Sequence, residues 1–329
     1  MPFGQLVEVM VKGEDDPVGD APRLPRHDDH DPHGRQSNDA VALIICCRDR
    51  AELLAGALAA ALAALRPQDE LLVVDSASYD STVADVARRH GVRVVRCEQP
   101  GLSRARNAGW RSTDRPFLLF TDDDCRLEPA AVRAAASALQ HAGTGVVWGR
   151  VVADGDDRRS LSVTAEGEPT EFDGSGDLSA TGHGAAMAFR REVLETLSGF
   201  DEALGAGGRF RAGEDKDAFW RAVKAGWRVR AEPLLQATHV TWRAQGEALR
   251  TLYGYGYGAG AVATKRRRVA GEREVLGELW RHGLLPAARF ARRGRLGDSA
   301  GAVVRALGCV NGAWQARRVP LERDHLVDA

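Results

Sequence analysis

Apolar and polar residues alternate in blocks along residues 41–125, and these blocks predict strands followed by helices. The run "VALIICC" from Val41 is short, apolar and rich in β-branched residues, which is typical of a buried strand. After three polar residues, the Ala/Leu-rich "AELLAGALAAALAALRP" predicts a helix. Further strands are predicted in "LLVVD", "VRVVRC" and "PFLLF", with helices in "VADVARRHG" and "GLSRARNAGWRST" between them. Alternating strands and helices indicate right-handed βαβ units and a parallel sheet.

Residues 126–242 continue with less regular patterns. We predict a helix in "AAVRAAASALQHAG", a strand in "TGVVWGRVV" and a Gly/Asp/Ser-rich loop to about residue 182. A strand leading into a helix follows in "GAAMAFRREVLETLSGF". A helix is predicted across "GEDKDAFWRAVKAGWRVRAEP", since its apolar residues recur on one helical face. The short strand "LLQATHV" then ends the compact part of the chain.

The two ends of the chain differ from this middle part. Residues 1–39 mix Pro, Gly, Asp and His with almost no apolar periodicity, which predicts a disordered leader. Residues 243–329 are predicted to form a basic helical extension, with fifteen Lys/Arg against five Asp/Glu between residues 243 and 318. Such helices can lie on an anionic membrane or pack on the preceding domain. The close spacing of Gly and Ala in "LYGYGYGAGAVATKRRR" favours packing.

Composition narrows the class of protein. With 329 residues and 44% hydrophobic residues, the chain has enough apolar material for a globular core. The formal net charge of -1 gives no indication of nucleic-acid binding. No run approaches the ~20 apolar residues of a membrane span, and the N-terminus lacks a signal pattern, so we expect a cytoplasmic protein. The odd number of cysteines, mostly in apolar runs, indicates reduced and buried thiols. They are Cys46, Cys47, Cys97, Cys125 and Cys309.

Polar side chains follow several of the predicted strands at the point where each strand ends. In parallel sheets, ligands bind at the carboxyl ends of the strands, and we expect these side chains to meet there. They are Arg48, Asp49, Asp75, Asp80 and the triplet Asp122-Asp123-Asp124. Asp75 and Asp80 also suit the start of the following helix, where a side-chain oxygen accepts backbone hydrogen bonds.

The triplet "DDD" needs a source of positive charge. Adjacent carboxylates repel one another, and a divalent cation such as Mg²⁺ or Mn²⁺ offsets that repulsion. Such an ion takes one or two protein carboxylates and completes its shell with water and phosphate oxygens, which predicts a metal–diphosphate site. The alternative is an acidic turn at the start of a helix. The rigid apolar strand "PFLLF" before the triplet favours the metal site.

A second acidic group opens a predicted helix at Glu214-Asp215-Lys216-Asp217. Acidic residues in a first helical turn are common, because they interact favourably with the helix dipole. The preceding Gly-rich stretch "GAGGRFRAG" is either a loop that closes over a bound substrate or a plain connector. About ninety residues separate the two acidic groups in sequence, so only the fold of the chain can bring them together.

The ordered set of these segments resembles the family 2 glycosyltransferases of the GT-A fold. It consists of "VALIICCRDR", "LLVVDSASYDST", "GLSRARNAG", "FLLFTDDDCRLEP", "GAAMAFRREVLETLSGFDEALG", "GEDKDAFWRAVKAGWRVRAEP" and "THV", and it covers residues 41–242. The resemblance implies an α/β Rossmann-like sheet with helices on both faces. It further implies a catalytic domain over residues 40–242. Residues 40–125 then bind a nucleotide-diphospho-sugar, residues 126–242 form the acceptor half, and residues 243–329 extend it.

Roles for the strand-end residues come from the same resemblance. Asp124 corresponds to the metal ligand, Asp122 to a partner that reaches ribose or metal, and Asp123 to a supporting residue. His239 in "ATHV" stands where related enzymes place a further metal ligand, although a lone His is more often structural. The remaining donor-binding candidates are Arg48, Asp49, Asp75, which corresponds to the residue that accepts the base imide N–H, and Arg106.

The resemblance assigns the general base to the second residue of the Glu-Asp pair. Asp215 is then the base that takes the acceptor's proton, Glu214 positions the substrate, and Asp217 is structural. A nearby cation is needed to keep Asp215 ionised, with Lys216 and Arg221 as candidates.

The predicted function is a metal-dependent, inverting glycosyltransferase that uses a nucleotide-diphospho-sugar as donor. A UDP-sugar is the first candidate for the donor, and the sequence does not identify the acceptor. One alternative is a nucleotidyltransferase-like enzyme, which should carry a Gly-rich basic loop directly after its first strand. The stretch "CCRDRAELL" lacks one. Another alternative is a non-catalytic nucleotide- or carbohydrate-binding module, and the presence of both acidic groups argues against it.

Overall fold

A computed structural model describes residues 39–154, 170–172, 174, 181–240, 247–272, 277 and 279–327. The predicted leader lies outside these residues except for Asp39, and most of the predicted loop before residue 182 lies outside them as well. None of the helices in the described part of the chain has the length and apolar content that a membrane crossing requires.

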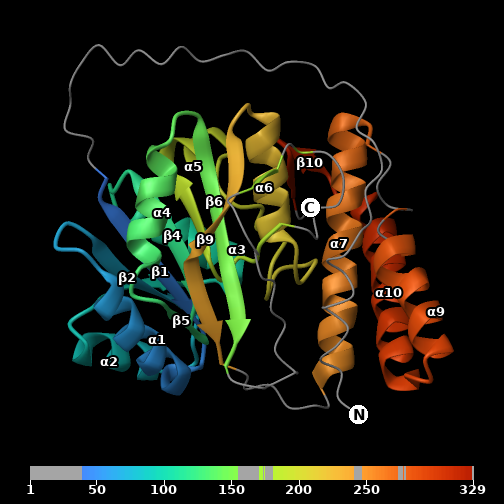
Figure 1. Cartoon of the computed structure of the whole chain (residues 1–329), viewed down its shortest axis with the longest axis horizontal. Helices are drawn as coiled ribbons and strands as arrows, with labels where there is room; N and C mark the ends of the chain where they lie inside the picture. The colour runs from blue at the N-terminus through green and yellow to red at the C-terminus, as the bar shows by residue number, and fades with distance from the viewer. Residues whose placement is uncertain are drawn as a thin grey trace.

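One large mixed sheet organises the described chain (Figure 1). Its strand order is β3-β2-β1-β4-β8-β6-β9-β5, with β7 paired to β9. The strands are β1 (Val41–Cys47), β2 (Glu70–Ser76), β3 (Arg93–Cys97), β4 (Phe117–Asp122), β5 (Cys125–Leu127), β6 (Thr144–Ala153), β7 (Glu171–Phe172), β8 (Met187–Arg190) and β9 (Arg228–His239). A separate hairpin, β10 (Leu321–Glu322) and β11 (His325–Leu326), ends the chain.

The prediction of a parallel sheet holds only for part of it. Strands β1 to β4 pair in parallel, whereas β8 runs antiparallel to both of its neighbours, β4 and β6. In the described chain no helix lies between β6 and β8, and an antiparallel pair needs no helical crossover. The parallel pattern is therefore interrupted at β8 in the second half, although β6 and β9 again pair in parallel.

The long helix predicted over residues 213–233 is wrong in its second half. Helix α6 (Glu214–Lys224) stops early, and "RVRAEPLLQATH" forms strand β9. Gly226 adopts a φ of +89°, and the amide of Trp227 donates to the carbonyl of Ala222, which turns the chain out of the helix. Strand β9 then pairs along most of β6, so tertiary pairing outweighs helical periodicity here.

Helices cover both faces of the sheet, as the resemblance implied. They are α1 (Ala51–Ala64), α2 (Thr82–Arg89), α3 (Leu102–Arg111), α4 (Ala131–Gln140), α5 (Arg191–Thr196) and α6. Alternate residues of β1 face opposite sides: Leu43 packs in the core with α1, α2 and α4, and Ile44 packs in the core with α3, α5 and α6. This two-sided burial explains the continuous apolar runs of the central strands.

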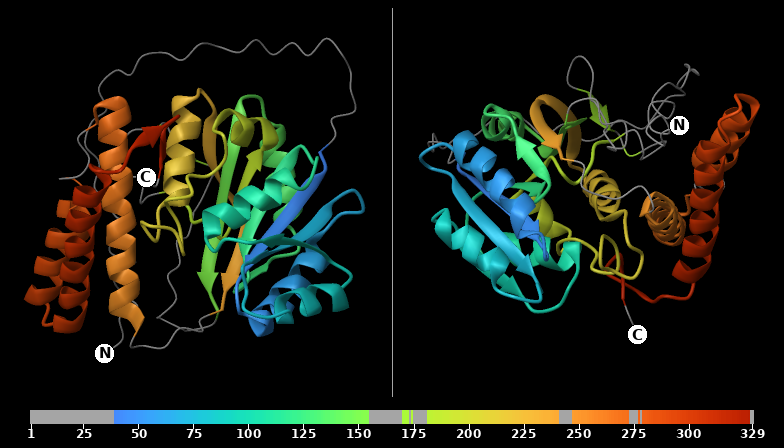
Figure 2. Two further views of the ribbon diagram at one scale, coloured as in Figure 1. Left: turned by 180° about the vertical axis from the view of Figure 1, so that it is seen from behind. Right: turned by 90° about the horizontal axis from the view of Figure 1, so that it is seen from below.

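The C-terminal extension forms a helical layer beyond α6 (Figures 1 and 2). It contains α7 (Ala248–Ala270), the π-helical turn η5 (Trp280–Leu284), α9 (Leu285–Arg292) and α10 (Leu296–Ala316). Helices α7 and α10 approach closely, because a Cβ added at Gly256 or Gly260 would lie 2.0 Å from a carbonyl oxygen of α10. Only glycine permits this approach, so the close spacing of glycine in α7 serves its packing on α10.

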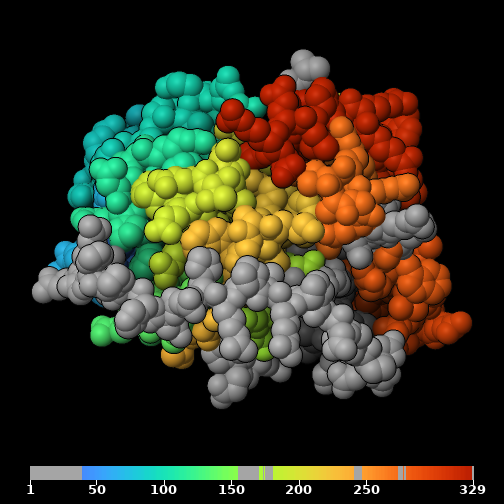
Figure 3. Space-filling model, turned by 90° about the horizontal axis from the view of Figure 1, so that it is seen from above, coloured from blue at the N-terminus to red at the C-terminus, as the bar shows by residue number. Residues whose placement is uncertain are grey.

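Buried polar contacts attach α7 to the sheet domain. The Lys265 ammonium lies 2.7 Å from carboxylate oxygens of both Asp201 and Asp217, and all three side chains are fully buried. The amide of Leu326 in the terminal hairpin also donates to Asp201. In Figure 3, the red atoms of the C-terminal residues adjoin the yellow atoms of the middle of the chain. The extension and the sheet domain therefore share a continuous interior.

Candidate active site

The ends of β1, β2 and β4 lie side by side at one edge of the sheet. In the parallel registers, Cys47 is opposite Asp75 and Cys46 is opposite Asp122. Polar residues that follow these strands therefore meet at the same edge, as the sequence predicts.

The first group of these residues surrounds the end of β2. The buried Asp75 carboxylate accepts hydrogen bonds from Arg96, at 2.6 Å, and from the amide of Ser78. Asp49 has a φ of +57° and accepts a hydrogen bond from the amide of Tyr79, and the Arg48 guanidinium lies over the Tyr79 ring. The loops after β1 and β2 are thus held together by side chain to backbone contacts.

Asp80 lies apart from this group. Its carboxylate is exposed and accepts hydrogen bonds from the amide and hydroxyl of Thr82 at the start of α2. These contacts fit the helix-start alternative given for this residue.

The acidic triplet is partly neutralised by a cation from the loop after β1. Arg50 lies 2.7 Å from the Asp123 carboxylate and 3.4 Å from Asp124. His239, at the end of β9, has its Nε2 atom 3.6 Å from the same Asp124 oxygen. The antiparallel pairing of β5 with β9 sets Cys125 opposite His239 and so brings the imidazole to the triplet.

Burial disfavours the ionised form of two carboxylates of the triplet. Burial raises the pKa of Asp123 to about 7, although the charge of Arg50 acts in the opposite direction. Burial also raises the pKa of Asp122, against the charge of Arg106. A further cation placed between these carboxylates would favour their ionised form.

Asp124 and His239 form the part of the site that fits a metal ion. Among the described residues, no three His, Cys, Asp or Glu side chains converge into a complete metal site. A carboxylate and an imidazole supply two ligands, which suits an ion that takes the rest of its shell from diphosphate oxygens and water. The donor set is therefore compatible with a divalent cation bound together with a diphosphate.

Arg106 joins the two acidic groups that are far apart in sequence. Its guanidinium is buried, with one nitrogen 2.7 Å from Glu214 and the other 3.3 Å from Asp122 and 3.2 Å from the carbonyl of Gly184. Helix α3 thus holds the end of β4 and the start of α6 together. The proposed contact of Arg106 with a donor stays a prediction, since these bonds are all to the protein.

The environments of Glu214 and Asp215 push their pKa values in opposite directions. Burial, together with the charge of Asp215, raises the pKa of Glu214. Burial alone would raise the pKa of Asp215 as well, but the charges of Lys216 and His183 outweigh it and lower that pKa. Asp215 also accepts a hydrogen bond from the amide of Gly184 at 2.9 Å. A pair of carboxyl groups separated in this way suits distinct roles in acid–base chemistry.

Of the two cations suggested for Asp215, Lys216 fits and Arg221 does not. The Lys216 ammonium donates to the carbonyls of Thr181 and Gly182 and still acts on the pKa of Asp215. Arg221 instead pairs with Asp217 at 2.8 Å. One helical turn separates Arg221 from Asp217, so the two residues share a face of α6 that Asp215 does not.

The Gly-rich stretch before α6 contacts α3. The carbonyl of Ala206 accepts a hydrogen bond from the amide of Leu102, and the carbonyl of Leu204 accepts one from the hydroxyl of Ser103. Gly205 has a φ of +86° and lies against Ser103 and Glu214. In this structure the stretch joins the starts of α3 and α6.

Sequence reasoning did not single out Arg50, Arg96 or His183. Arg50 belongs to the strand-end loop "RDR", so its position was a usable signal. Arg96 lies within β3 and reaches Asp75 only through the register of β2 with β3. His183 is buried next to Asp215, and no sequence pattern marked it.

Comparison with known proteins agrees with this arrangement. Residues 42–198 match the model of a family described as glycosyl transferase family 2. The comparison with curated proteins gives no match.

Two solved structures illustrate the similarity in fold. The mannosyltransferase PcManGT from Pyrobaculum calidifontis, in complex with GDP-Man and Mn²⁺, is 19% identical with a TM-score of 0.60, and 94% of this chain and 93% of that chain are covered. TarS 1-349 from S. aureus, in complex with UDP-GlcNAc, is 13% identical with a TM-score of 0.52, covering 81% of this chain and 90% of that chain. At these identities, the likeness establishes the GT-A type of fold.

Proposed function

Because residues 42–198 belong to glycosyl transferase family 2 and the chain is a glycosyltransferase, we propose that it transfers a sugar from a nucleotide-diphospho-sugar with inversion and with the help of a divalent cation. One observation carries the proposal. Arg106 links Asp122, at the strand edge where a donor would bind, to the Glu214-Asp215 pair. This contact supports a donor site and a base within one region, as a transfer reaction requires.

The donor is held, in this proposal, along the ends of β1, β2 and β4. Asp75, whose carboxylate accepts hydrogen bonds from Arg96 and from the amide of Ser78, accepts the base imide N–H in this proposal. Arg48 and Asp49 flank the base, and Asp122 and Asp123 lie beside the ribose and diphosphate. The two similar enzymes were solved with GDP-Man and with UDP-GlcNAc, and a UDP-sugar is our first candidate for this chain.

Asp124 and His239 would hold the divalent cation, Mg²⁺ or Mn²⁺. When bound, such an ion stabilises negative charge on a departing diphosphate. The Asp124 oxygen and His239 Nε2 are 3.6 Å apart, so both atoms could bind the same ion. Arg50 also contacts Asp124, and in this proposal its positive charge lies near the diphosphate.

Asp215 acts as the general base. It takes the proton from the acceptor's hydroxyl, whose oxygen forms a bond to the anomeric carbon while the bond from that carbon to the diphosphate oxygen breaks. The nucleoside diphosphate leaves from the opposite side, so the configuration inverts. The lowered pKa of Asp215 supports this role, because a base must be ionised before it accepts a proton. Glu214, fixed by Arg106, positions the acceptor.

Asp215→Asn tests the division between base and donor site. We expect transfer to fall by about 10²–10⁴-fold, the usual worth of general-base catalysis, with donor affinity nearly unchanged. Asp80→Asn is the matched control, since Asp80 is exposed and contacts only Thr82. A large loss of donor affinity in Asp215→Asn would instead assign that residue to the diphosphate or metal shell.

The donor itself can be found by thermal shift. UDP-, dTDP- and GDP-sugars are compared with and without Mn²⁺, and at least one nucleotide sugar should raise the melting temperature more when the metal is present. If no nucleotide raises it in a metal-dependent way, the proposed donor site is wrong.

A further inference from the structure

A row of large apolar side chains is exposed on the outer side of the C-terminal helical layer. We call this surface the outer face. It consists of Trp280, Leu284, Leu296, Val303, Leu307, Val310 and Trp314. Leu296 is 73% exposed and Leu307 is 59% exposed, values far from those of core residues. Only five other large hydrophobic residues are exposed in the described chain, and they are scattered along residues 62–269.

The spacing of these residues makes the outer face continuous along α10. Leu296, Val303, Leu307, Val310 and Trp314 follow one another at intervals of seven, four, three and four residues, which places them on one side of a helix. The opposite side of α10 packs on α7 through glycine and alanine. A helix that is apolar on both sides buries one of them in its own fold and leaves the other for a further partner.

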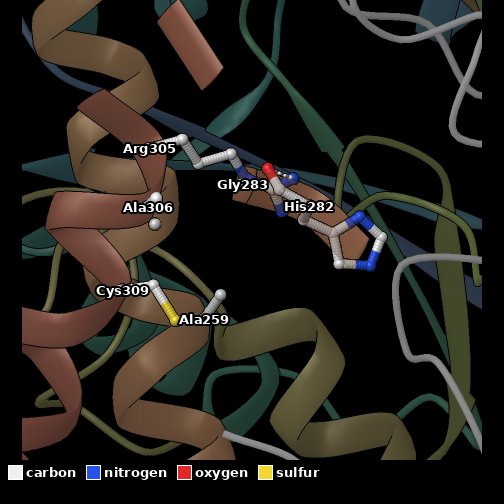
Figure 4. Close-up of a pocket in the computed structure, with 7 residues that line it drawn as sticks. Ala259, His282, Gly283, Arg305, Ala306 and Cys309 are labelled. Carbon is white, nitrogen blue, oxygen red and sulfur yellow. Dashed lines mark hydrogen bonds between the residues drawn. The ribbon is translucent and has the colours of Figure 1, made fainter. Parts of the chain in front are cut away.

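The charged residue in the middle of α10 turns away from the outer face. Figure 4 shows the Arg305 side chain extending from α10 toward His282, whose carbonyl accepts a hydrogen bond at 3.3 Å. The acid Asp298 is buried and pairs with Arg295. Asp298 and Arg305 are the only charged residues of α10 between Leu296 and Trp314, so this stretch of the outer face presents apolar side chains without an exposed charge.

The exposed charges of the helical layer are positive. Residues 279–318 contain eight arginines and a single acid, Asp298. Six of the arginines are exposed: Arg281, Arg289, Arg292, Arg293, Arg317 and Arg318. Arg318 stacks over the Trp314 ring at 3.6 Å, so one cation lies directly beside an exposed aromatic side chain. The layer thus combines an exposed apolar surface with exposed basic residues, in a chain whose overall net charge is -1.

This combination decides between two partners. A second copy of the chain would bring two equally basic surfaces together, and like charges facing each other disfavour such an interface. An anionic lipid surface offers both phosphate groups for the arginines and hydrocarbon for the apolar side chains, with tryptophan suited to the boundary between them. We propose that the outer face docks the protein on the surface of an anionic membrane, with α10 lying along the plane of the lipid headgroups.

The surface is large enough for this contact. Helix α10 has 21 residues and is therefore about 30 Å long. The turn η5 and α9 pack beside it, and Trp280 and Leu284 of η5 are exposed as well. Docking leaves the chain on the membrane surface, in agreement with the finding that no described helix can cross a bilayer. This proposal concerns binding alone and does not depend on which sugar is transferred.

Sedimentation with lipid vesicles tests the proposal on the full chain. The protein is mixed with vesicles of phosphatidylcholine alone or of phosphatidylcholine with phosphatidylglycerol. We expect binding to the anionic vesicles only, weakened by salt, and a blue shift of tryptophan fluorescence. Removal of two arginines in Arg292→Gln/Arg293→Gln should lower the partition constant more than tenfold, since each basic residue near such a surface contributes roughly fivefold.

Apolar variants separate this contact from simple charge attraction. Leu307→Ser/Val310→Ser should abolish vesicle binding, whereas Leu234→Ser, which is at least as exposed but lies in β9, should leave it unchanged. Circular dichroism and melting temperature, compared with those of the unchanged chain, verify that the exposed substitutions leave the fold intact.

Three outcomes would overturn the proposal. The first is the absence of vesicle binding at low salt. The second is a dimer in light scattering that Leu307→Ser/Val310→Ser dissociates, without vesicle binding, which assigns the face to a second copy. The third is binding to heparin together with vesicle binding that the apolar variants leave unchanged, which reduces the contact to a charge effect.

Discussion

Replacement of Lys265 by methionine should destabilise the protein strongly. The Lys265 ammonium is 2.7 Å from the Asp201 and Asp217 carboxylates, and none of the three side chains is exposed. Methionine fills nearly the same volume, so the variant mainly removes the charge. Two carboxylates then stay in the interior with less compensation, although Arg221 still pairs with Asp217 and the amide of Leu326 still donates to Asp201.

The expected size follows from these contacts. Removal of one partner from a buried ion pair costs about 3–5 kcal/mol, and the loss of a shared cation should fall in this range. Domains are typically stable by only about 5–15 kcal/mol, so Lys265→Met should remove a large fraction of the total. Urea unfolding, followed by tryptophan fluorescence and extrapolated linearly to water, measures the difference.

Two controls make the measurement specific. Arg267→Met changes the exposed arginine two positions later in α7 and should cost no more than about 0.5 kcal/mol. Adding Asp201→Asn and Asp217→Asn to Lys265→Met removes the orphaned charges and should restore part of the lost stability. Equal stability of Lys265→Met and Arg267→Met would refute the reasoning, because the buried ammonium would then contribute nothing.

Three further predictions concern the metal, the helical layer and pH. Asp124→Asn should abolish the Mn²⁺ dependence of the donor-induced thermal shift, whereas Asp122→Asn should weaken donor binding and keep that dependence; equal behaviour would reject the division between them. Gly260→Val should lower the melting temperature by several degrees, since its side chain meets a carbonyl oxygen of α10, whereas the exposed Gly271→Ala, at a φ of +74° with open space around it, should cost less. Burial lowers the pKa of His183 from 6.5 to about 4, so the unfolded chain binds a proton at this residue more readily than the folded chain. The free energy of unfolding should therefore be highest above pH 6.5 and fall by up to ~3 kcal/mol as the pH drops toward 4. His183→Gln should remove this slope in urea unfolding at a series of pH values, and an unchanged slope would assign it to other groups.

The first half of the fold was predictable because local patterns there agree with tertiary structure. The run "VALIICC" is a buried strand by composition alone, and the strand-end positions of Asp75 and Asp122 follow from the βαβ pattern. Strand β9 was predicted as helix up to Pro233, because "AFWRAVKAGWRV" keeps a helical apolar spacing past the point where Gly226 turns the chain. Pairing with β6 decides that segment, and no local pattern reports pairing at a distance.

The candidate site divides in the same way. Acidic groups are visible in sequence because their residues are adjacent, as in the triplet and in Glu214-Asp215. The cations that pair with acidic residues come from elsewhere in the chain. Arg50 reaches the triplet from the loop after β1, Arg96 reaches Asp75 from β3, and Lys265 reaches Asp217 from the helical extension. Their partners depend on the register of strands and the docking of α7, which arise only when the whole chain folds.

Arg106 carries a consequence for the exchange of segments between related chains. It satisfies Asp122 on one side and Glu214 on the other, and it occupies the space that a side chain at position 184 would need, since a Cβ at Gly184 would lie 2.7 Å from its guanidinium. A chimera that imports residues 181–240 from another protein must therefore import a glycine at 184 and an acid at 214, or change position 106 as well. The two halves of the domain are not interchangeable modules, and positions 106, 122, 184 and 214 are expected to vary as one unit.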